Sequence, residues 1–186
     1  MPADLSRARR GIRSLEAPAQ QRLPLPTEPR GGAIGSAVTL RAAGLPPDTE
    51  LLIAFANLQN YQLIQRVTTD STGSFTTVSE VPRWAVLDGV HYFFASFADE
   101  IPLAFSNGFH VTEADGTARV EGTVENADGG CVDLRNAGDV VYHLVGDVGQ
   151  RKPGARIAVT GAIADPSACG GGGPVISIRQ ITDLPR

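Results

Sequence analysis

The pattern of a β-hairpin is clearest in residues 131–145, which read CVDLRNAGDVVYHLV. Val132 and Leu134 alternate with more polar residues, the period of a half-buried strand. Residues 136–139, Asn-Ala-Gly-Asp, are types that form tight turns, and an apolar run from Val140 to Val145 follows them. This stretch therefore predicts two strands joined by a hairpin loop.

Three further stretches with strand character flank this hairpin, at residues 120–124, 156–160 and 175–181. Each is bounded by glycine or proline, which mark turns. Five short strands in about 65 residues are typical of a small OB-type barrel. We predict an OB-like β-barrel domain over residues 114–186.

The region 31–113 shows a different turn spacing. Its run Leu51–Ala56 is apolar throughout, which favours burial on both faces of a sheet. Turn signals such as Asp70–Gly73 and the corner Pro82–Trp84 separate further short strands. About seven strands in fewer than ~80 residues match an immunoglobulin-like sandwich. We predict an Ig-like β-sandwich here, with Trp84 and the phenylalanines in its core.

The composition supports an all-β, turn-rich protein. The chain has 186 residues, of which 42% are hydrophobic and 19% charged, enough apolar material for a core. Its 21 glycines and 13 prolines serve the many turns. The formal net charge is -4, and neither predicted domain has Lys and Arg at the density that a duplex-binding surface needs, so duplex nucleic acid is not an expected partner.

Residues 1–30 read as a flexible N-terminal arm. They carry six Arg against three acidic residues, and Pro18, Pro24, Pro26 and Pro29 disfavour helix and strand ladders. No apolar run follows the basic start, so the arm does not read as a secretory signal. No run of 18 apolar residues predicts a transmembrane helix. The arm is a candidate for self-assembly.

The two cysteines, Cys131 and Cys169, are 38 positions apart and form no CxxC pair. A zinc site needs four ligands, normally in two close pairs, so no metal is expected. The spacing favours one structural disulfide, which would imply an oxidising compartment. Two buried free thiols are the alternative.

Both predicted domains carry recognisable motifs. In the first they are Gly35–Leu40, Gly44–Pro47, Thr69-Asp70-x-x-Gly73-x-Phe75, Val81-Pro82-x-Trp84-Ala85 and Phe109–Thr112. With these motifs the first domain resembles bacterial Ig-like domains of the IPT/TIG type. In the second they are Gly122, Cys131-Val132-x-Leu134, Tyr142-x-Leu144-x-Gly146-Asp147, Pro153-Gly154-x-x-Ile157-x-Val159-x-Gly161, Cys169 and Ile176-x-Ile178. With these motifs the second domain resembles a bacterial domain-of-unknown-function family with an OB-like barrel.

These resemblances imply an exported or surface-associated bacterial protein whose two cysteines are paired, and they imply no known activity. They therefore favour an extracellular or periplasmic location. Exported relatives would carry a signal peptide, which the arm does not resemble.

The sequence offers no catalytic residue that we would assign. His91, His110 and His143 lie in predicted strands without a G-x-S-x-G elbow, and we expect them on the surface or at strand edges. Asp147 and the pair Asp99-Glu100 are expected to serve in turns. The loop at Asp70 has too few carboxylates for calcium, and Gly170–Gly173 lacks the Lys-Ser/Thr of a phosphate loop. We expect neither cofactor nor metal.

Five residues of the predicted barrel are candidates for binding. OB barrels bind ligands through aromatic and basic side chains. Tyr142 is the one aromatic residue after position 113, and His143 follows it. The basic residues Arg151, Lys152 and Arg156 form a small cluster. A solvated basic patch is the simpler interpretation of that cluster.

The sequence thus predicts a non-enzymatic protein that acts in binding or assembly, with a protein or cell-surface partner. An OB-type binder of oligonucleotide or oligosaccharide is a first alternative. A hydrolytic enzyme with loop-borne carboxylates, Asp147 foremost, is a second.

Overall fold

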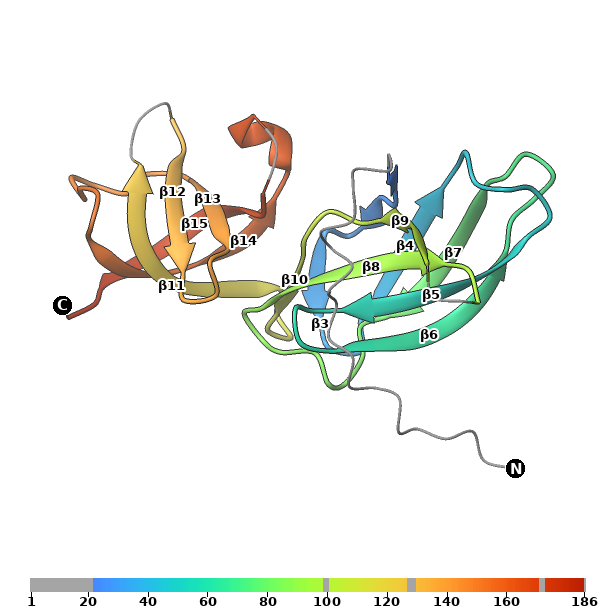
Figure 1. The fold of residues 1–186 in the computed structure, drawn as a ribbon. Helices are drawn as coiled ribbons and strands as arrows, with labels where there is room; N and C mark the ends of the chain where they lie inside the picture. Colours follow the sequence, from blue (N-terminus) through green and yellow to red (C-terminus); the bar gives the residue numbers. More distant parts are fainter. Residues whose placement is uncertain (1–21, 99–100, 127–129, 171–172, 186) are drawn as a thin grey trace. The chain divides into compact units, whose positions relative to one another are not determined.

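The computed structural model describes residues 22–98, 101–126, 130–170 and 173–185. It is an all-β fold with a sandwich of two sheets and a closed five-stranded barrel, as the sequence predicts (Figure 1). The strands are β1 (Leu23–Pro24), β2 (Thr27–Glu28), β3 (Gly31–Ala33), β4 (Ala37–Ala42), β5 (Glu50–Ala56), β6 (Tyr61–Thr68), β7 (Phe75–Glu80), β8 (Val90–Ser96), β9 (Pro102–Phe105), β10 (Phe109–Thr112), β11 (Thr117–Asn126), β12 (Val132–Asn136), β13 (Val141–Val145), β14 (Arg156–Ala164) and β15 (Val175–Asp183). A short 3-10 helix, η3 (Pro166–Cys169), precedes β15.

The chain forms two compact units built from discontinuous segments. Within the described residues, the first unit contains 22–27, 39–79, 91–98 and 101–106. The second contains the segments 28–38 and 80–90 together with everything described after residue 106. In the second unit β3 and β10 form a parallel pair, and the barrel follows them in sequence.

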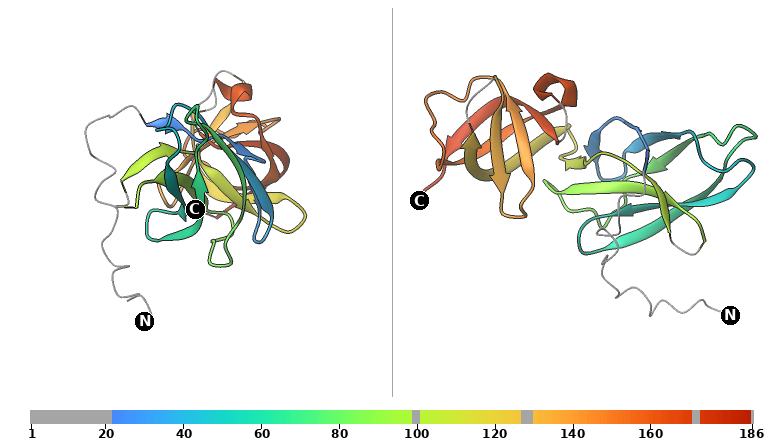
Figure 2. Two further views of the ribbon diagram at one scale, coloured as in Figure 1. Left: turned by 90° about the vertical axis from the view of Figure 1, so that its right-hand side faces the viewer. Right: turned by 45° about the horizontal axis from the view of Figure 1, so that its top comes forward.

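The core of the first unit is built mainly by β5 and β8, which bury most of their residues. Within the seven-stranded sheet, the strands β1, β9, β8, β5 and β6 of this unit pair in that order, and β4 and β7 belong to the second sheet, β2-β4-β7. Figure 2 shows the strands in two further views. Phe55 on β5 and Phe93 on β8 are fully buried cross-strand partners with edge-to-face rings 4.7 Å apart. The prediction that Leu51–Ala56 is buried on both faces is confirmed, since every residue of that run is buried.

The expectation that prolines keep residues 22–30 out of strand ladders is wrong. β1 pairs in parallel with β9, with Pro24 opposite Phe105. Proline lacks an N–H but keeps its carbonyl, so it is tolerated in an edge strand. The amide of Leu25 supplies the next ladder bond, to the Phe105 carbonyl oxygen at 2.8 Å, and the Leu25 side chain is buried. Residues 1–21 of the predicted arm lie outside the described residues.

The barrel closes in the order β11-β12-β13-β15-β14, with β13 and β15 parallel and the other pairs antiparallel. The hairpin predicted from residues 131–145 is present as β12 and β13. The Asn136 side chain closes its turn by accepting hydrogen bonds from the amides of Gly138 and Val140. Alternate residues of each strand fill the core, and they include Val120, Val124, Leu134, Leu144, Ile157, Val159 and Ile176.

Candidate functional site

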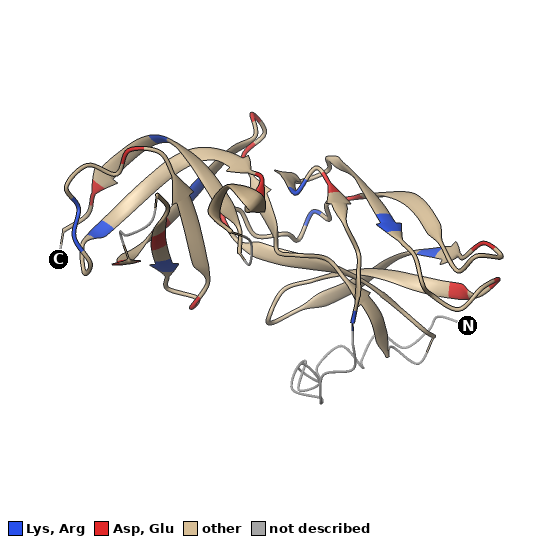
Figure 3. Ribbon diagram, turned by 90° about the horizontal axis from the view of Figure 1, so that it is seen from above, with Lys and Arg blue, Asp and Glu red and all other residues tan. Residues whose placement is uncertain are grey.

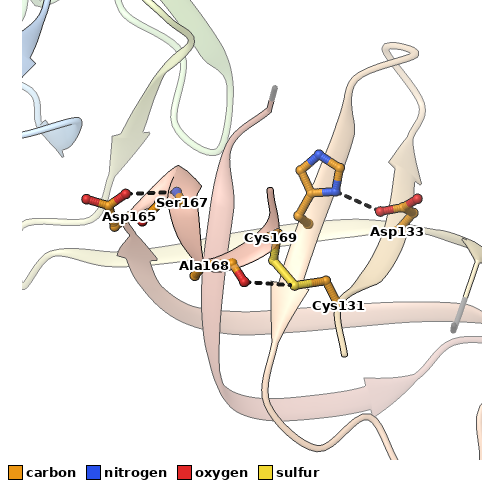
Figure 4. Close-up of a disulfide and its surroundings, with 7 residues drawn as sticks. Cys131, Asp133, Asp165, Ser167, Ala168 and Cys169 are labelled. Carbon is orange, nitrogen blue, oxygen red and sulfur yellow. Dashed lines mark hydrogen bonds and ion pairs between the residues drawn. A yellow bond between two sulfur atoms is a disulfide. The ribbon is translucent and has the colours of Figure 1, made fainter. Parts of the chain in front are cut away.

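A disulfide joins two loops at one end of the barrel. Cys131 precedes β12 and Cys169 ends η3 in the loop before β15, and their Cα atoms are 5.8 Å apart (Figure 4). The predicted pairing is confirmed, and the alternative of two free thiols is wrong. The bond links the β11–β12 loop to the β14–β15 loop, the two loops that border ligands in OB folds.

The β14–β15 loop is organised by its own hydrogen bonds. The Asp165 carboxylate caps η3 by accepting a hydrogen bond from the Ser167 amide at 2.8 Å (Figure 4). That bond holds the pKa of the Asp165 carboxyl below its ordinary value. Gly170 ends the helix at a φ of 79°, a conformation that glycine adopts without strain. The segment that carries Cys169 therefore has a defined backbone conformation.

An aspartate–histidine pair lies on the outer surface of the barrel beside this loop. Asp133 on β12 and His143 on β13 are direct cross-strand partners, and the Asp133 carboxylate is 2.7 Å from His143 Nδ1 (Figure 4). The His143 amide donates to the Pro174 carbonyl oxygen, and a Cβ added to Gly173 would lie 3.1 Å from the imidazole. The end of the β14–β15 loop thus lies against the imidazole. We call Asp133, His143 and the disulfide the clasped face.

A second ion pair extends this surface toward β11. The Arg135 guanidinium donates two hydrogen bonds to the two carboxylate oxygens of Glu125. The Arg135 hydrogen bond holds the pKa of the Glu125 carboxyl below its ordinary value. Acidic and basic side chains therefore alternate over neighbouring strands, and the charged segments of the barrel are intermixed in Figure 3.

The Glu125–Arg135 pair predicts an acid-side dependence of stability. A carboxyl whose pKa is lowered by folding stabilises above its unfolded pKa, and the contribution disappears as the pH falls through its folded pKa. In Glu125→Gln, urea midpoints measured between about pH 5 and pH 3 should therefore change less steeply with pH than in wild type. Arg135→Lys, which loses the bidentate hydrogen bond to Glu125, should also make the urea midpoint depend less steeply on pH. An unchanged slope in both variants would contradict this interpretation.

Tyr142 is not a surface aromatic as the sequence suggested. The ring is fully buried in the barrel core, because residue 142 falls on the inward side of the β12–β13 hairpin. Its hydroxyl shares a hydrogen bond of 3.2 Å with Nδ1 of the equally buried His110 on β10. Tyr142 therefore serves the core, and within the described barrel residues no aromatic ring is exposed.

Removing the Tyr142 hydroxyl should weaken the second unit. Tyr142→Phe keeps the ring but leaves His110 without this bond, and we expect a loss of about 1–2 kcal/mol in the free energy of unfolding. Guanidinium unfolding followed by circular dichroism measures it. The double variant Tyr142→Phe with His110→Phe should lose less unfolding free energy than the sum of the two single variants if the two groups act as a pair. Strict additivity would show that they do not.

The expectation that all three histidines lie at the surface is wrong for two of them. His110 is buried against Tyr142, and His91 is buried with its ring stacked on Phe55 at 4.8 Å. Both histidines lie in strands whose other residues are largely apolar. An imidazole ring can pack among such residues as an aromatic ring does. Only the side chain of His143 is partly exposed.

One member of the predicted basic cluster, Arg151, is paired with a carboxylate. Arg151 donates hydrogen bonds of 2.7 and 3.1 Å to the two carboxylate oxygens of Asp183. Arg156 donates to the Pro185 carbonyl oxygen at 3.1 Å, and Lys152 is exposed. The structure does not bring these residues together with Tyr142, which is buried. Asp183 therefore compensates the charge of Arg151, whereas the carbonyl bonded to Arg156 does not compensate that guanidinium charge.

The candidate acidic residues lie in turns. The Asp147 side chain accepts a hydrogen bond from the Gly149 amide, as predicted for a turn residue. Asp70 accepts from Thr72 and Ser74, and the Thr72 hydroxyl bond is the main cause of its lowered pKa. Asp99 and Glu100 lie outside the described residues. Among the described residues, no cluster of three metal-binding side chains occurs.

A shallow groove also occurs in the second unit, with a volume of about 470 Å³. It is lined largely by small residues, among them Gly31, Gly32 and Ala162. Arg30 and Asp165 also line it, and their charged groups are 3.8 Å apart. The groove therefore presents little side-chain chemistry beyond one exposed ion pair.

Sequence reasoning missed the Asp133–His143 pair, although the signal was present. The two residues lie five positions on either side of Gly138, on which the hairpin register is centred, so pairing places them opposite one another. The clasped face can present hydrogen-bonding groups to a partner. A scan of protein-family models and a search of curated proteins find no match to this chain. In the part of the chain that the structure describes, no helix is long and apolar enough to cross a membrane.

Proposed function

We propose that this protein is a non-enzymatic binding or assembly protein of an oxidising compartment, outside the bacterial cytoplasm. The observation that carries the proposal is the Cys131–Cys169 disulfide, which fixes the two loops beside the Asp133–His143 pair. Its working surface is the clasped face. The partner is a protein or another component of the cell surface.

The compartment follows from redox chemistry. Disulfides persist where thiols are not continuously reduced, as in the periplasm or outside the cell. Both cysteines of the chain are used in this bond. Small domains with limited cores depend on such cross-links, and the barrel is of that size.

The clasped face suits a partner because it is held in place. A loop that is rigid before binding loses less entropy on association than a mobile one. The disulfide holds the loop at Cys169, the last residue of η3, and the Pro174 carbonyl holds it just before β15. The imidazole and carboxylate beside it supply directed hydrogen bonds that select a partner.

Binding of an oligosaccharide is the second candidate, supported by the barrel's strand order and its parallel β13–β15 pair, an OB-like arrangement. The oligonucleotide version has less support, because nucleobases stack on exposed aromatic rings and Tyr142 is buried. The hydrolytic alternative through Asp147 has less support too, since that carboxylate caps a turn.

Cell fractionation with thiol trapping tests the compartment. Cells are treated with an alkylating reagent, and the intact mass of the endogenous protein is measured in each fraction before and after reduction. We expect the protein outside the cytoplasm, unalkylated, and able to take two alkyl groups only after reduction. Cytosolic protein that is alkylated at both cysteines without reduction would overturn the proposal.

Cross-linking in intact cells tests the surface. Asp133→Ala with His143→Ala removes both polar groups of the clasped face without touching the core, and should abolish a discrete cross-linked species formed by the wild type. Arg119→Ala with Glu121→Ala, an exposed ion pair on β11, is the matched control and should retain that species. Equal cross-linking by both double variants would remove the clasped face as the binding surface.

A further inference from the structure

The outer side of the larger sheet in the first unit is apolar. Ala54 and Ala56 on β5 lie opposite Phe94 and Tyr92 on β8, and direct cross-strand partners share one face of a sheet. Phe55 and Phe93, the intervening residues, point to the core. The outer side of a sandwich sheet is normally polar, but here it carries alanine side chains with aromatic rings beside them.

Registers with the neighbouring strands complete this surface. Tyr61 on β6 lies opposite Ala56, and Phe105 on β9 lies opposite Phe94. Phe94 stacks on Phe105 at 5.6 Å and is tilted against Tyr61 at 6.3 Å. We call Ala54, Ala56, Tyr61, Phe94 and Phe105 the aromatic face.

Water has little access to the floor of the aromatic face. Ala54, Ala56 and Phe94 are buried, while Tyr61 and Phe105 are partly exposed. Burial also raises the pKa of Tyr92 on the same side of the sheet. Leu63, opposite Ala54, is 41% exposed at the edge strand. This surface has the properties of a docking site for another segment.

The first described residue of the chain already lies on this surface. The guanidinium carbon of Arg22 is 4.7 Å from the centre of the Phe105 ring, a cation–π contact. The chain immediately before Arg22 therefore starts at the β9 side of the aromatic face.

The chemistry of that preceding segment matches the face. Residues 1–21 contain three larger aliphatic side chains, Leu5, Ile12 and Leu15, and four arginines, Arg7, Arg9, Arg10 and Arg13. Aliphatic groups fit the alanine floors and guanidinium groups stack on aromatic rings, as Arg22 does. At ~3.3 Å per residue such a segment can reach about 70 Å. The four strands from β9 to β6, ~4.8 Å apart, span only about 14 Å.

We propose that residues 1–21 occupy the aromatic face of their own chain, crossing it from Phe105 on β9 toward Leu63 on β6. The occupant is intramolecular because Arg22 anchors its end on the same chain, which gives the segment a high effective concentration at the face. The contact shields an apolar sheet surface that would otherwise be open to other molecules.

Photo-cross-linking in the full-length protein tests this proposal. Leu63 is replaced by p-benzoylphenylalanine in an equal mixture of isotopically light and heavy copies, and cross-linked peptides are identified by mass spectrometry after irradiation. We expect cross-links to residues 1–21 within one copy. Val78, 57% exposed on β7 of the other sheet, is the control position and should give no such cross-links.

A second variant separates the ring contact from general proximity. Phe105→Leu keeps an apolar side chain but removes the ring on which Arg22 stacks, and it should lower the yield of cross-links from position 63. Cross-links only between copies would replace the proposal with docking of a second copy. Cross-links from position 63 that never reach residues 1–21, or equal yields from positions 63 and 78, would overturn it.

Discussion

Replacing Cys131 and Cys169 together by serine is expected to lower the free energy of unfolding of the second unit by about 4 kcal/mol. The disulfide spans 38 positions, and the cross-link removes the loop-closure entropy of that length from the unfolded chain. This is the largest loss of unfolding free energy that we expect from a change at the surface. It is large because the whole stability of a small domain is only a few kcal/mol.

The loss should be local at first. Cys131 is tied to the strand that carries Asp133, and Cys169 to the loop that lies against His143. Without the bond the β14–β15 loop should exchange its amide hydrogens faster, and the barrel strands should open before β5 and β8 of the first unit. Hydrogen exchange followed by mass spectrometry resolves these segments.

Chemical reduction of the wild type provides the matched control. Unfolding in the presence of a reductant should reproduce the midpoint of the double serine variant. If the variant unfolds within about 1 kcal/mol of the oxidised wild type, the disulfide contributes much less than the loop-closure account requires.

Replacing Gly161 by alanine should be the most damaging change of a single residue in the barrel, with a cost of about 3 kcal/mol or loss of folding. Gly161 lies on β14 next to a register shift, where β15 approaches closely. A Cβ at this position would overlap the Ser177 carbonyl oxygen and crowd the Ile176 side chain. Backbone atoms of a paired strand cannot move aside without breaking the ladder.

Gly138→Ala is the control for this prediction. Gly138 lies in the exposed turn between β12 and β13, and the nearest atom to an added Cβ would be 3.5 Å away in the flexible Asn136 side chain. It should stay within about 0.5 kcal/mol of wild type. Thermal unfolding of both variants measures the difference. Equal melting temperatures would show that the backbone of β15 can shift to accommodate the added Cβ.

The secondary structure was largely predictable from local pattern. Alternation of apolar and polar residues identified β12 and β13, and the Asn136 turn joined them, because a side-chain period of two and a tight turn are local properties. The apolar run Leu51–Ala56 predicted burial on both faces for the same reason. Pairing of the two cysteines needed only their number and separation to be favoured.

Errors arose where the environment of a residue, and not its type, decides its role. Pro24 was expected to exclude a strand, yet it pairs at a sheet edge, where its missing N–H costs little. Tyr142 is a binding candidate by its residue type and His110 is expected at the surface or a strand edge, yet each is buried because the other supplies a hydrogen-bond partner. No local pattern reports such partners.

The sequence by itself determined an all-β chain and the central hairpin of the barrel, because strand period and turn chemistry are local properties. With two cysteines and no metal-binding pair, it also favoured a single disulfide. Only the tertiary structure decided that the disulfide holds the loop beside Asp133 and His143, and that Arg151 is paired with Asp183. It also decided that an aromatic face covers the outer side of a sheet. Each depends on which distant strands become neighbours, and burial and charge pairing are properties of those neighbours.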